Sequence, residues 1–473
     1  MRLGRTTAVY FSSKTIGSVF GFLAMVYFGR TLGEAVLGQY ALVLAVVMWA
    51  AIAGKVGVAS AVKKRISEQQ EPAQYLGAGV VVLLVMGIVI AGILLSISSY
   101  VNAYVGAPVA ELIIILLFAA MYRSFVASSL EGHHRVHFAA PVSALRQLLR
   151  AGTQILLVML GFGLTGLLWG YVTGYIVAAT IGLWVLGLRP AVPSRQHLNG
   201  LFRYARYAWL GNVRWQTFNG FDIAILGFFV SQAFVGIYSV AWLCGQFLNF
   251  FSRAISASLF PTMSERTIKD GIQGVSELVE AGLAYAGLLL LPGFVGAIVV
   301  GDYLLAIFGD GFARGHLVLV VLVAALIVYA YFSQLLNTLN AIDRPDLAFR
   351  ANAALILTNM LLNVVFIWQI GWLGAAVATA ISAAAAFIVA FHYVNCCVPF
   401  HFPIREVTFQ LISALCMGAV VIGFRMIVTR KYMIPEEALA IILIGSGAVV
   451  YFCFILLFSS RFRNTVYDNI IDG

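Results

Sequence analysis

The chain has 473 residues, of which 62% are hydrophobic and only 10% are charged. Soluble globular chains average roughly 45–50% apolar and 25% charged residues, so this composition excludes an ordinary soluble domain. The formal net charge of +10 does not indicate a nucleic-acid partner, because the sequence lacks the basic soluble patch which that role requires.

Apolar runs of about 20 residues recur along the whole sequence, and each is long enough to cross the hydrocarbon core of a bilayer as a helix. Lipid offers no hydrogen-bond partners to the backbone, so such runs must be helical. The first run lacks a small-residue cleavage site and is therefore expected to be retained. We predict an all-α polytopic membrane protein with about 14 transmembrane helices, at residues 8–29, 36–60, 76–98, 109–129, 139–160, 164–187, 206–229, 232–259, 281–300, 315–337, 347–369, 372–393, 407–428 and 435–458.

The distribution of lysine and arginine favours an orientation with both the N- and the C-terminus in the cytoplasm. With the N-terminus inside, 21 of the 29 basic residues are assigned to inside segments and five to outside segments. This bias follows the positive-inside rule. The inside set includes Arg123, Arg146 and Arg150. We therefore expect a multi-pass protein of the cytoplasmic (inner) membrane.

The sequence repeats itself. The segment VLGQYALV, which begins at residue 36, resembles FVGIYSVA, which begins at residue 234, and Gly38 then matches Gly236 at an offset of 198. The first span of each half starts inside, so the halves have the same orientation, as in parallel-repeat transporters. We infer two pseudo-symmetric six-helix lobes at 1–198 and 199–398, followed by two additional helices and a cytoplasmic tail at 399–473.

Three basic residues within the predicted spans, Lys14, Lys55 and Arg214, are assigned to neither side of the membrane. At the repeat offset Lys55 matches Arg253, and Lys14 matches Arg214 at an offset of 200. One interpretation is that these long side chains reach the inner headgroups. The other is that they line a cavity between the lobes, where four cations would attract an anion. The duplicated pattern favours the cavity, and a phosphate or pyrophosphate suits the guanidinium fork.

One acid, Asp222, lies deep in a predicted span, eight residues after Arg214. It is either an internal counter-ion or a coupling site for a proton or Na⁺. The five cysteines have no paired spacing, so we expect no disulfide framework. The segment GFGLTG at 161–166 matches G-x-G-x-x-G, but no strand precedes it, so a dinucleotide site is not predicted. With no Walker A motif, nucleophile elbow or zinc-protease motif, we expect neither an enzyme nor a cofactor nor a metal site.

Several segments resemble one family. YFGRTLGEAVLGQYALVLAVV, FDIAILGFFVSQAFVGIYSVAW, LLAIFGDGFARG and LNAIDRPDLAFRANAALILTNMLLNVVFIWQIGWLGAAVATAIS are similar to polysaccharide flippases of the multidrug/oligosaccharidyl-lipid/polysaccharide exporter superfamily. The resemblance implies two six-helix lobes in a V and alternating access. It also implies that cations of a central cavity bind the lipid phosphate, at the positions of Lys14, Lys55, Arg214 and Arg253. Asp222 matches the acid of a D-x-x-x-L-G pattern in the seventh span.

The function expected from this resemblance is a flippase that translocates a polyprenyl-(pyro)phosphate-linked oligosaccharide across the cytoplasmic membrane, for cell-surface polysaccharide or glycan synthesis. The expected partners are this substrate, membrane lipids and a coupling ion, with the protein acting as a monomer. The alternative is a cation-coupled multidrug exporter of the same superfamily. Such an exporter needs acids in its cavity, whereas this sequence offers mainly lysine and arginine.

Overall fold

The computed structural model describes residues 2–55, 57–68, 71–133, 136–431 and 435–471, apart from the side chains of 2–18, 55, 136–137, 139–140, 206–219, 429–431, 465–466 and 468–471. Every regular element in these residues is helical. Contacts between Cα atoms divide the chain into two compact units, residues 1–236 and 237–473. The lobe boundary at residue 198, which the repeat suggests, remains a prediction.

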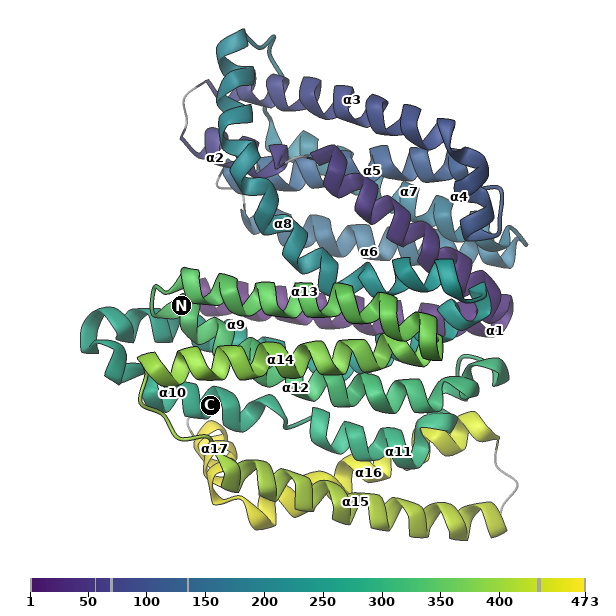
Figure 1. Cartoon of the computed structure of the whole chain (residues 1–473), viewed down its shortest axis with the longest axis vertical. Coiled ribbons are helices and arrows are strands. Elements are labelled where there is room, and N and C mark those ends of the chain that lie inside the picture. Colours follow the sequence, from purple (N-terminus) through teal and green to yellow (C-terminus); the bar gives the residue numbers. More distant parts are fainter. Residues whose placement is uncertain (1, 56, 69–70, 134–135, 432–434, 472–473) are drawn as a thin grey trace. The chain divides into compact units, whose positions relative to one another are not determined.

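Unit 1 is a bundle in which α6 and α7 run side by side over most of their length, with α5 packed against α7 (Figure 1). The bundle also packs α1 against α5, α6 and α8. Its helices are α1 (Arg2–Lys55), α2 (Val58–Ser67), α3 (Pro72–Ser96), α4 (Ser98–Val105), α5 (Ala110–Gly132), α6 (Val136–Met159), α7 (Gly163–Leu186) and α8 (Arg195–Phe229).

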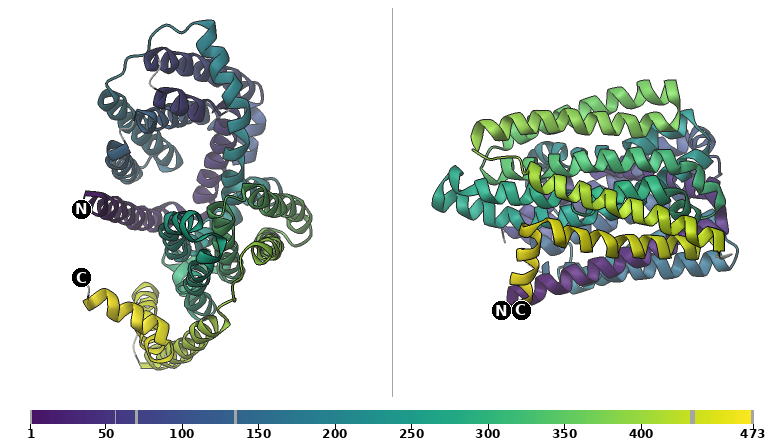
Figure 2. Two further views of the ribbon diagram at one scale, coloured as in Figure 1. Left: turned by 90° about the vertical axis from the view of Figure 1, so that its left-hand side faces the viewer. Right: turned by 90° about the horizontal axis from the view of Figure 1, so that it is seen from below.

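Unit 2 is a second helical bundle, in which α14 packs against both α12 and α13, and α15 and α16 pack against α11 (Figures 1 and 2). The helix α9 (Gln232–Asp270) begins at the end of unit 1 and continues into unit 2. The remaining elements are η1 (Ile272–Val275), α10 (Ser276–Ala286), α11 (Leu290–Ala306), η2 (Asp310–Gly315), α12 (His316–Ala341), α13 (Pro345–Ile370), α14 (Trp372–Cys397), α15 (Ile404–Lys431), α16 (Glu436–Phe458) and α17 (Ser460–Ile471).

Glycine breaks the helices at two places in unit 1. Within α1, Gly33 has φ 77° and ψ 175°, a conformation that other residues adopt only with strain, so α1 consists of two helical segments. Gly57, with φ 74°, separates α1 from α2. The predicted span 36–60 is therefore interrupted near its end, a detail that hydropathy does not report.

Two predicted spans of the second half also differ from the helices observed. The span predicted at 232–259 extends to Asp270, although Pro261 lies inside α9. The span predicted at 281–300 is divided into α10 and α11 by a turn at residues 287–289. Pro292 follows in the first turn of α11, where its missing N–H costs no helical hydrogen bond.

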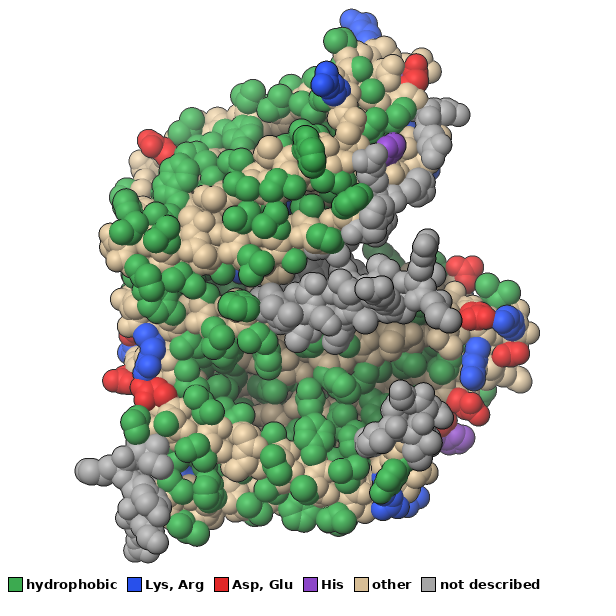
Figure 3. Space-filling model, turned by 180° about the vertical axis from the view of Figure 1, so that it is seen from behind, with side chains coloured by type: hydrophobic (Ala, Val, Ile, Leu, Met, Phe, Trp, Pro, Cys, Tyr) green, Lys and Arg blue, Asp and Glu red, His purple; other side chains and the backbone are tan. Residues whose placement is uncertain are grey.

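The surface of each unit is suited to lipid. Large apolar side chains are exposed along α13, for example Leu361 at 69% and Trp368 at 75%. Hydrophobic side chains cover the flanks in the space-filling view, while charged side chains gather toward the helix ends (Figure 3). Exposed apolar surface of this extent is unfavourable in water. The protein is therefore an all-helical, multi-pass membrane protein.

Among the described residues, 11 helices are long and apolar enough to cross a membrane. The set counts α1 as one helix, although Gly33 divides it. It includes neither α6 nor α8. The count of 14 transmembrane helices remains a prediction.

The two additional helices of the sequence, α15 and α16, are attached to α11. Arg425 on α15 donates a hydrogen bond from Nη1 to the carbonyl oxygen of Val299 at 2.7 Å, and its Nη2 lies 3.5 Å from the Oδ2 of Asp302. Met417 and Leu443 join Val295 and Val299 in one apolar cluster. These helices therefore belong to the core of unit 2.

Candidate functional site

The structure describes only part of the predicted cation set. Lys14 and Lys55 lie on α1 and Arg214 lies on α8, but the side chains of all three fall outside the described residues. Their meeting at one site therefore stays a prediction, as does their role in binding a phosphate.

The fourth predicted cation, Arg253, lies on α9 with an exposed side chain. Its Nη1 donates a hydrogen bond to the Oε1 of Gln246 at 3.2 Å. The sequence placed Arg253 at the boundary of a span, but α9 continues for more than four turns beyond it. Pro261 therefore does not terminate α9, and the role of Arg253 in binding a phosphate stays a prediction.

Asp222 lies on α8 with only 5% of its surface exposed. Its surroundings are set by packing between α8, α1 and α4. The ring of Phe221 lies 6.1 Å from that of Trp49 on α1, and the hydroxyl of Tyr104 on α4 donates to the carbonyl oxygen of Ala224 at 2.7 Å. A carboxylate at this depth suits either a counter-ion or a proton or cation site, and both interpretations stay open.

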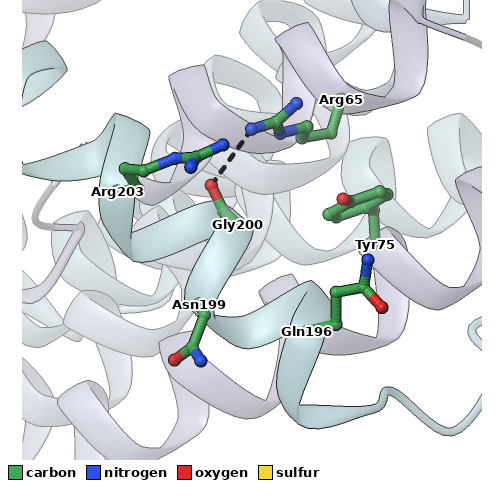
Figure 4. A pocket seen from close by; sticks show the side chains of 6 residues that line it. All are labelled: Arg65, Tyr75, Gln196, Asn199, Gly200 and Arg203. Carbon is green, nitrogen blue, oxygen red and sulfur yellow. Dashed lines mark hydrogen bonds between the residues drawn. The ribbon is translucent and has the colours of Figure 1, made fainter.

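A pocket of about 530 Å³ lies at one end of unit 1, between α2, α3 and α8. The Nη2 of Arg65 lies 3.5 Å from the carbonyl oxygen of Gly200, and its guanidinium lies 5.7 Å from the ring centroid of Tyr75. Figure 4 shows the guanidinium groups of Arg65 and Arg203 on the same rim of the pocket. The lining is completed by the side-chain amides of Gln196 and Asn199. Such a set of donors can bind a polar or anionic group.

The first turn of α8 is fixed against α3 beside this pocket. The Nδ1 of His197 lies 2.7 Å from the Oγ of Ser194, and its Nε2 lies 2.7 Å from the Oε2 of Glu71. Its ring also contacts that of Tyr75 at 4.9 Å between centroids. These contacts cap the N-terminus of α8 and hold this wall of the pocket in place.

A second basic cluster lies inside unit 1, on α5, α6 and α7. Arg150 donates from Nη1 to the hydroxyl of Tyr171 at 2.8 Å, and its guanidinium lies 4.7 Å from the centroid of that ring. The guanidinium groups of Arg123 and Arg146 lie 5.2 Å and 5.8 Å from the ring centroid of Tyr175. We call these five residues the arginine–tyrosine cluster.

Arg123, Arg146 and Arg150, which the sequence analysis counts with the inside segments, lie within α5 and α6, and the side of the membrane that they face stays a prediction. Each arginine lies more than two turns from either end of its helix. A signal was present in the sequence, because Arg146 and Arg150 are spaced i,i+4, as are Tyr171 and Tyr175, and such pairs share one helix face. The positive-inside bias keeps its sign without the three arginines.

Glycines on α7 bring the cluster together. A Cβ added at Gly174 would lie 2.9 Å from the Cβ of Arg150 and 3.0 Å from the carbonyl oxygen of Arg146, and one added at Gly170 would lie 2.2 Å from the Cγ of Gln154. The absence of side chains at these positions lets α6 and α7 approach closely, which places both arginines beside the tyrosines.

Comparison with known proteins identifies the family. The family model described as "Polysaccharide biosynthesis protein" matches residues 3–267. The chain belongs to this family. "Probable flippase AglR" of Haloferax volcanii is 32% identical over 472 residues, which cover 98% of each chain. "Probable low-salt glycan biosynthesis flippase Agl15" of the same organism is 30% identical over 477 residues, which cover 100% of this chain and 99% of the relative.

The fold of this family member is also found among solved structures. The lipid II flippase MurJ, in an inward closed conformation, superimposes with a TM-score of 0.80 over 97% of this chain and 100% of its own. The sequence identity is 15%, so this likeness concerns the fold alone.

Proposed function

We propose that this protein is a flippase that translocates a polyprenyl-(pyro)phosphate-linked oligosaccharide across the cytoplasmic membrane, for cell-surface polysaccharide or glycan synthesis. The observation that carries this proposal is the relationship to two flippases along the whole chain, at 32% and 30% identity. The protein is a transporter rather than an enzyme.

The route that we propose is alternating access by two six-helix lobes, residues 1–198 and 199–398, with 14 transmembrane helices in total and both termini in the cytoplasm. The internal repeat and the excess of basic residues in the inside segments support this arrangement. We further propose that the protein works as a monomer.

The substrate phosphate is proposed to bind Lys14, Lys55, Arg214 and Arg253. Support comes from their matched positions in the two halves of the sequence, and from the preference of guanidinium and ammonium groups for phosphate. Asp222, buried on α8, is proposed to couple transport to a proton or Na⁺.

Deletion of the gene tests the proposed function. Lipid-linked oligosaccharides would be quantified by mass spectrometry, and their sidedness measured by the access of a lectin or glycosidase added outside intact cells. We expect intact lipid-linked oligosaccharides to accumulate on the inner leaflet, and a plasmid copy of the gene to reverse the accumulation. Normal appearance of these lipids outside the deletion strain would rule the flippase out.

A further inference from the structure

The arginine–tyrosine cluster places three positive charges in the middle of unit 1. Arg123 and Arg146 share the ring of Tyr175, and Arg150 follows Arg146 by one turn on the same face of α6. The rings of Tyr171 and Tyr175 lie 5.3 Å apart between centroids. The three guanidinium groups therefore line one aromatic wall.

These charges have no protein counter-ion among the side chains that the structure describes. None of the ion pairs recorded there includes Arg123, Arg146 or Arg150. The Nε of each of the three is buried without a hydrogen-bond acceptor. A guanidinium stays protonated under physiological conditions, and contact with a neutral tyrosine offsets only part of the cost of removing a full charge from water. Among the described side chains, the three arginines therefore have no carboxylate partner.

The geometry favours an oxyanion over a spherical ion. A guanidinium presents donors along its edges, and a phosphate or carboxylate accepts two of them in parallel. In each of the three arginines the Nε, which forms part of one such edge, is buried and has no hydrogen-bond acceptor. The phenol of Tyr171 already satisfies one Nη of Arg150 and holds that guanidinium against the ring, so its remaining donors are fixed in direction.

The packing around the cluster preorganises it. Gly174 lets the backbone of α6 approach α7, and a Cβ added at Gly21 on α1 would lie 3.8 Å from an Nη of Arg150. Gln154, one turn after Arg150, donates to the hydroxyl of Tyr40 at 3.0 Å and to the carbonyl oxygen of Leu167 at 2.8 Å. The helices that carry the arginines are therefore held by close contacts that need no anion.

We propose that Arg123, Arg146 and Arg150 form an oxyanion-binding site of the phosphate class inside unit 1, with Tyr171 and Tyr175 as its aromatic wall. The site is separate from the four cations proposed above to bind the substrate phosphate. Its occupant is the phosphate of a lipid carrier or a free inorganic oxyanion; the first source rests on the proposed function, and the second does not.

The test measures the thermal unfolding of the purified full-length protein in detergent. The probes are sodium phosphate, sodium pyrophosphate and a short-chain polyprenyl phosphate, compared with sodium chloride at matched ionic strength and with the corresponding neutral polyprenol. A ligand that binds the folded state raises the Tm with its concentration. We expect the oxyanions to raise the Tm beyond chloride, and Arg150→Gln to weaken this response at least about tenfold in apparent affinity.

Three variants sharpen the test. Arg189→Gln removes an exposed arginine of a connecting segment and should leave the response unchanged. Arg203→Gln measures what the pocket of Arg65 and Arg203 contributes to the response. If Arg150→Gln does not accumulate, Arg150→Lys keeps the charge but removes the fork, and should lose the preference for oxyanions over chloride.

Each outcome decides the proposal. A response to inorganic oxyanions alone supports a site for a free ion, whereas a response to polyprenyl phosphate but not to polyprenol supports the carrier as the source. No response beyond chloride overturns the site, and so does a response that Arg150→Gln retains or that Arg203→Gln removes. The result does not depend on transport: an inactive transporter with this response would refute the flippase and leave the site standing.

Discussion

Arginine has a different energetic role at different places in this protein. At Arg425 the guanidinium has both a carbonyl and a carboxylate partner and joins α15 to α11. In the arginine–tyrosine cluster the described partners are neutral tyrosines. Charges inside a membrane protein are costly and usually face a partner or a cavity, so the first arrangement stabilises the fold and the second is expected to serve a ligand.

Two cations of the proposed phosphate site can be tested one residue at a time. Lys14→Ala and Arg214→Ala should each lower complementation of a deletion strain at least about tenfold, since losing a charge-assisted hydrogen bond costs about 1.5–3 kcal/mol and tenfold corresponds to 1.4 kcal/mol. The growth or glycan phenotype would be measured with the membrane level of each variant quantified by immunoblot.

The matched control is Arg189→Ala, which removes an exposed arginine and should complement fully. Full activity of both Lys14→Ala and Arg214→Ala at normal membrane levels would contradict the phosphate site. The two side chains would then be assigned to the headgroup region, which long basic side chains commonly reach.

At the scale of elements, the contact between α6 and α7 is the most specific packing of unit 1. A Cβ at Gly174 would meet the backbone carbonyl of Arg146 and the Cβ of Arg150, neither of which can rotate away. Gly174→Ala should therefore lower the stability by up to about 2 kcal/mol, because overpacking costs about 1–3 kcal/mol and the gain in helix propensity offsets about 1 kcal/mol of that cost. The measurement is the Tm in detergent.

Gly152 on α6 provides the control, because a Cβ there would meet nothing within 4 Å. Gly152→Ala should leave the Tm unchanged or raise it slightly, as expected for a helix interior. Equal behaviour of the two variants would show that α6 and α7 do not pack in the way described.

The sequence predicts the elements better than their ends. Apolar runs indicate where helices lie, because helix formation in lipid follows from the lack of other hydrogen-bond partners. The breaks at Gly33 and Gly57 depend on backbone dihedrals, and the direction in which Arg150 points depends on the small residues of the facing helix. Hydropathy contains neither kind of information, so the arginine–tyrosine cluster was missed.

At the scale of the whole molecule, the composition and the recurring apolar runs predicted an all-helical membrane protein, and this prediction is confirmed. The orientation of the chain in the membrane is a separate prediction, which rests on the distribution of lysine and arginine. The repeat could not predict how α15 and α16 are attached, because they lie outside it; Arg425 and the apolar cluster with α11 supply that contact.

Cysteine accessibility tests the orientation. In a variant with the five native cysteines replaced by alanine, Ala107→Cys, between α4 and α5, should react with a membrane-impermeant maleimide in intact cells. Arg189→Cys, between α7 and α8, should react only after the cells are permeabilised, because its segment is predicted to lie inside. The reverse pattern would place the N-terminus outside the cell.

The most direct test of the central claim is translocation by the purified protein in proteoliposomes that contain a lipid-linked oligosaccharide. A glycosidase added outside reports how much oligosaccharide faces outward as time passes. The account predicts that the accessible fraction rises from about half to nearly all with the wild-type protein and Arg189→Ala, and stays near half with Lys14→Ala and Arg214→Ala. A wild-type time course identical to that of protein-free liposomes, with or without a proton or Na⁺ gradient, would contradict it.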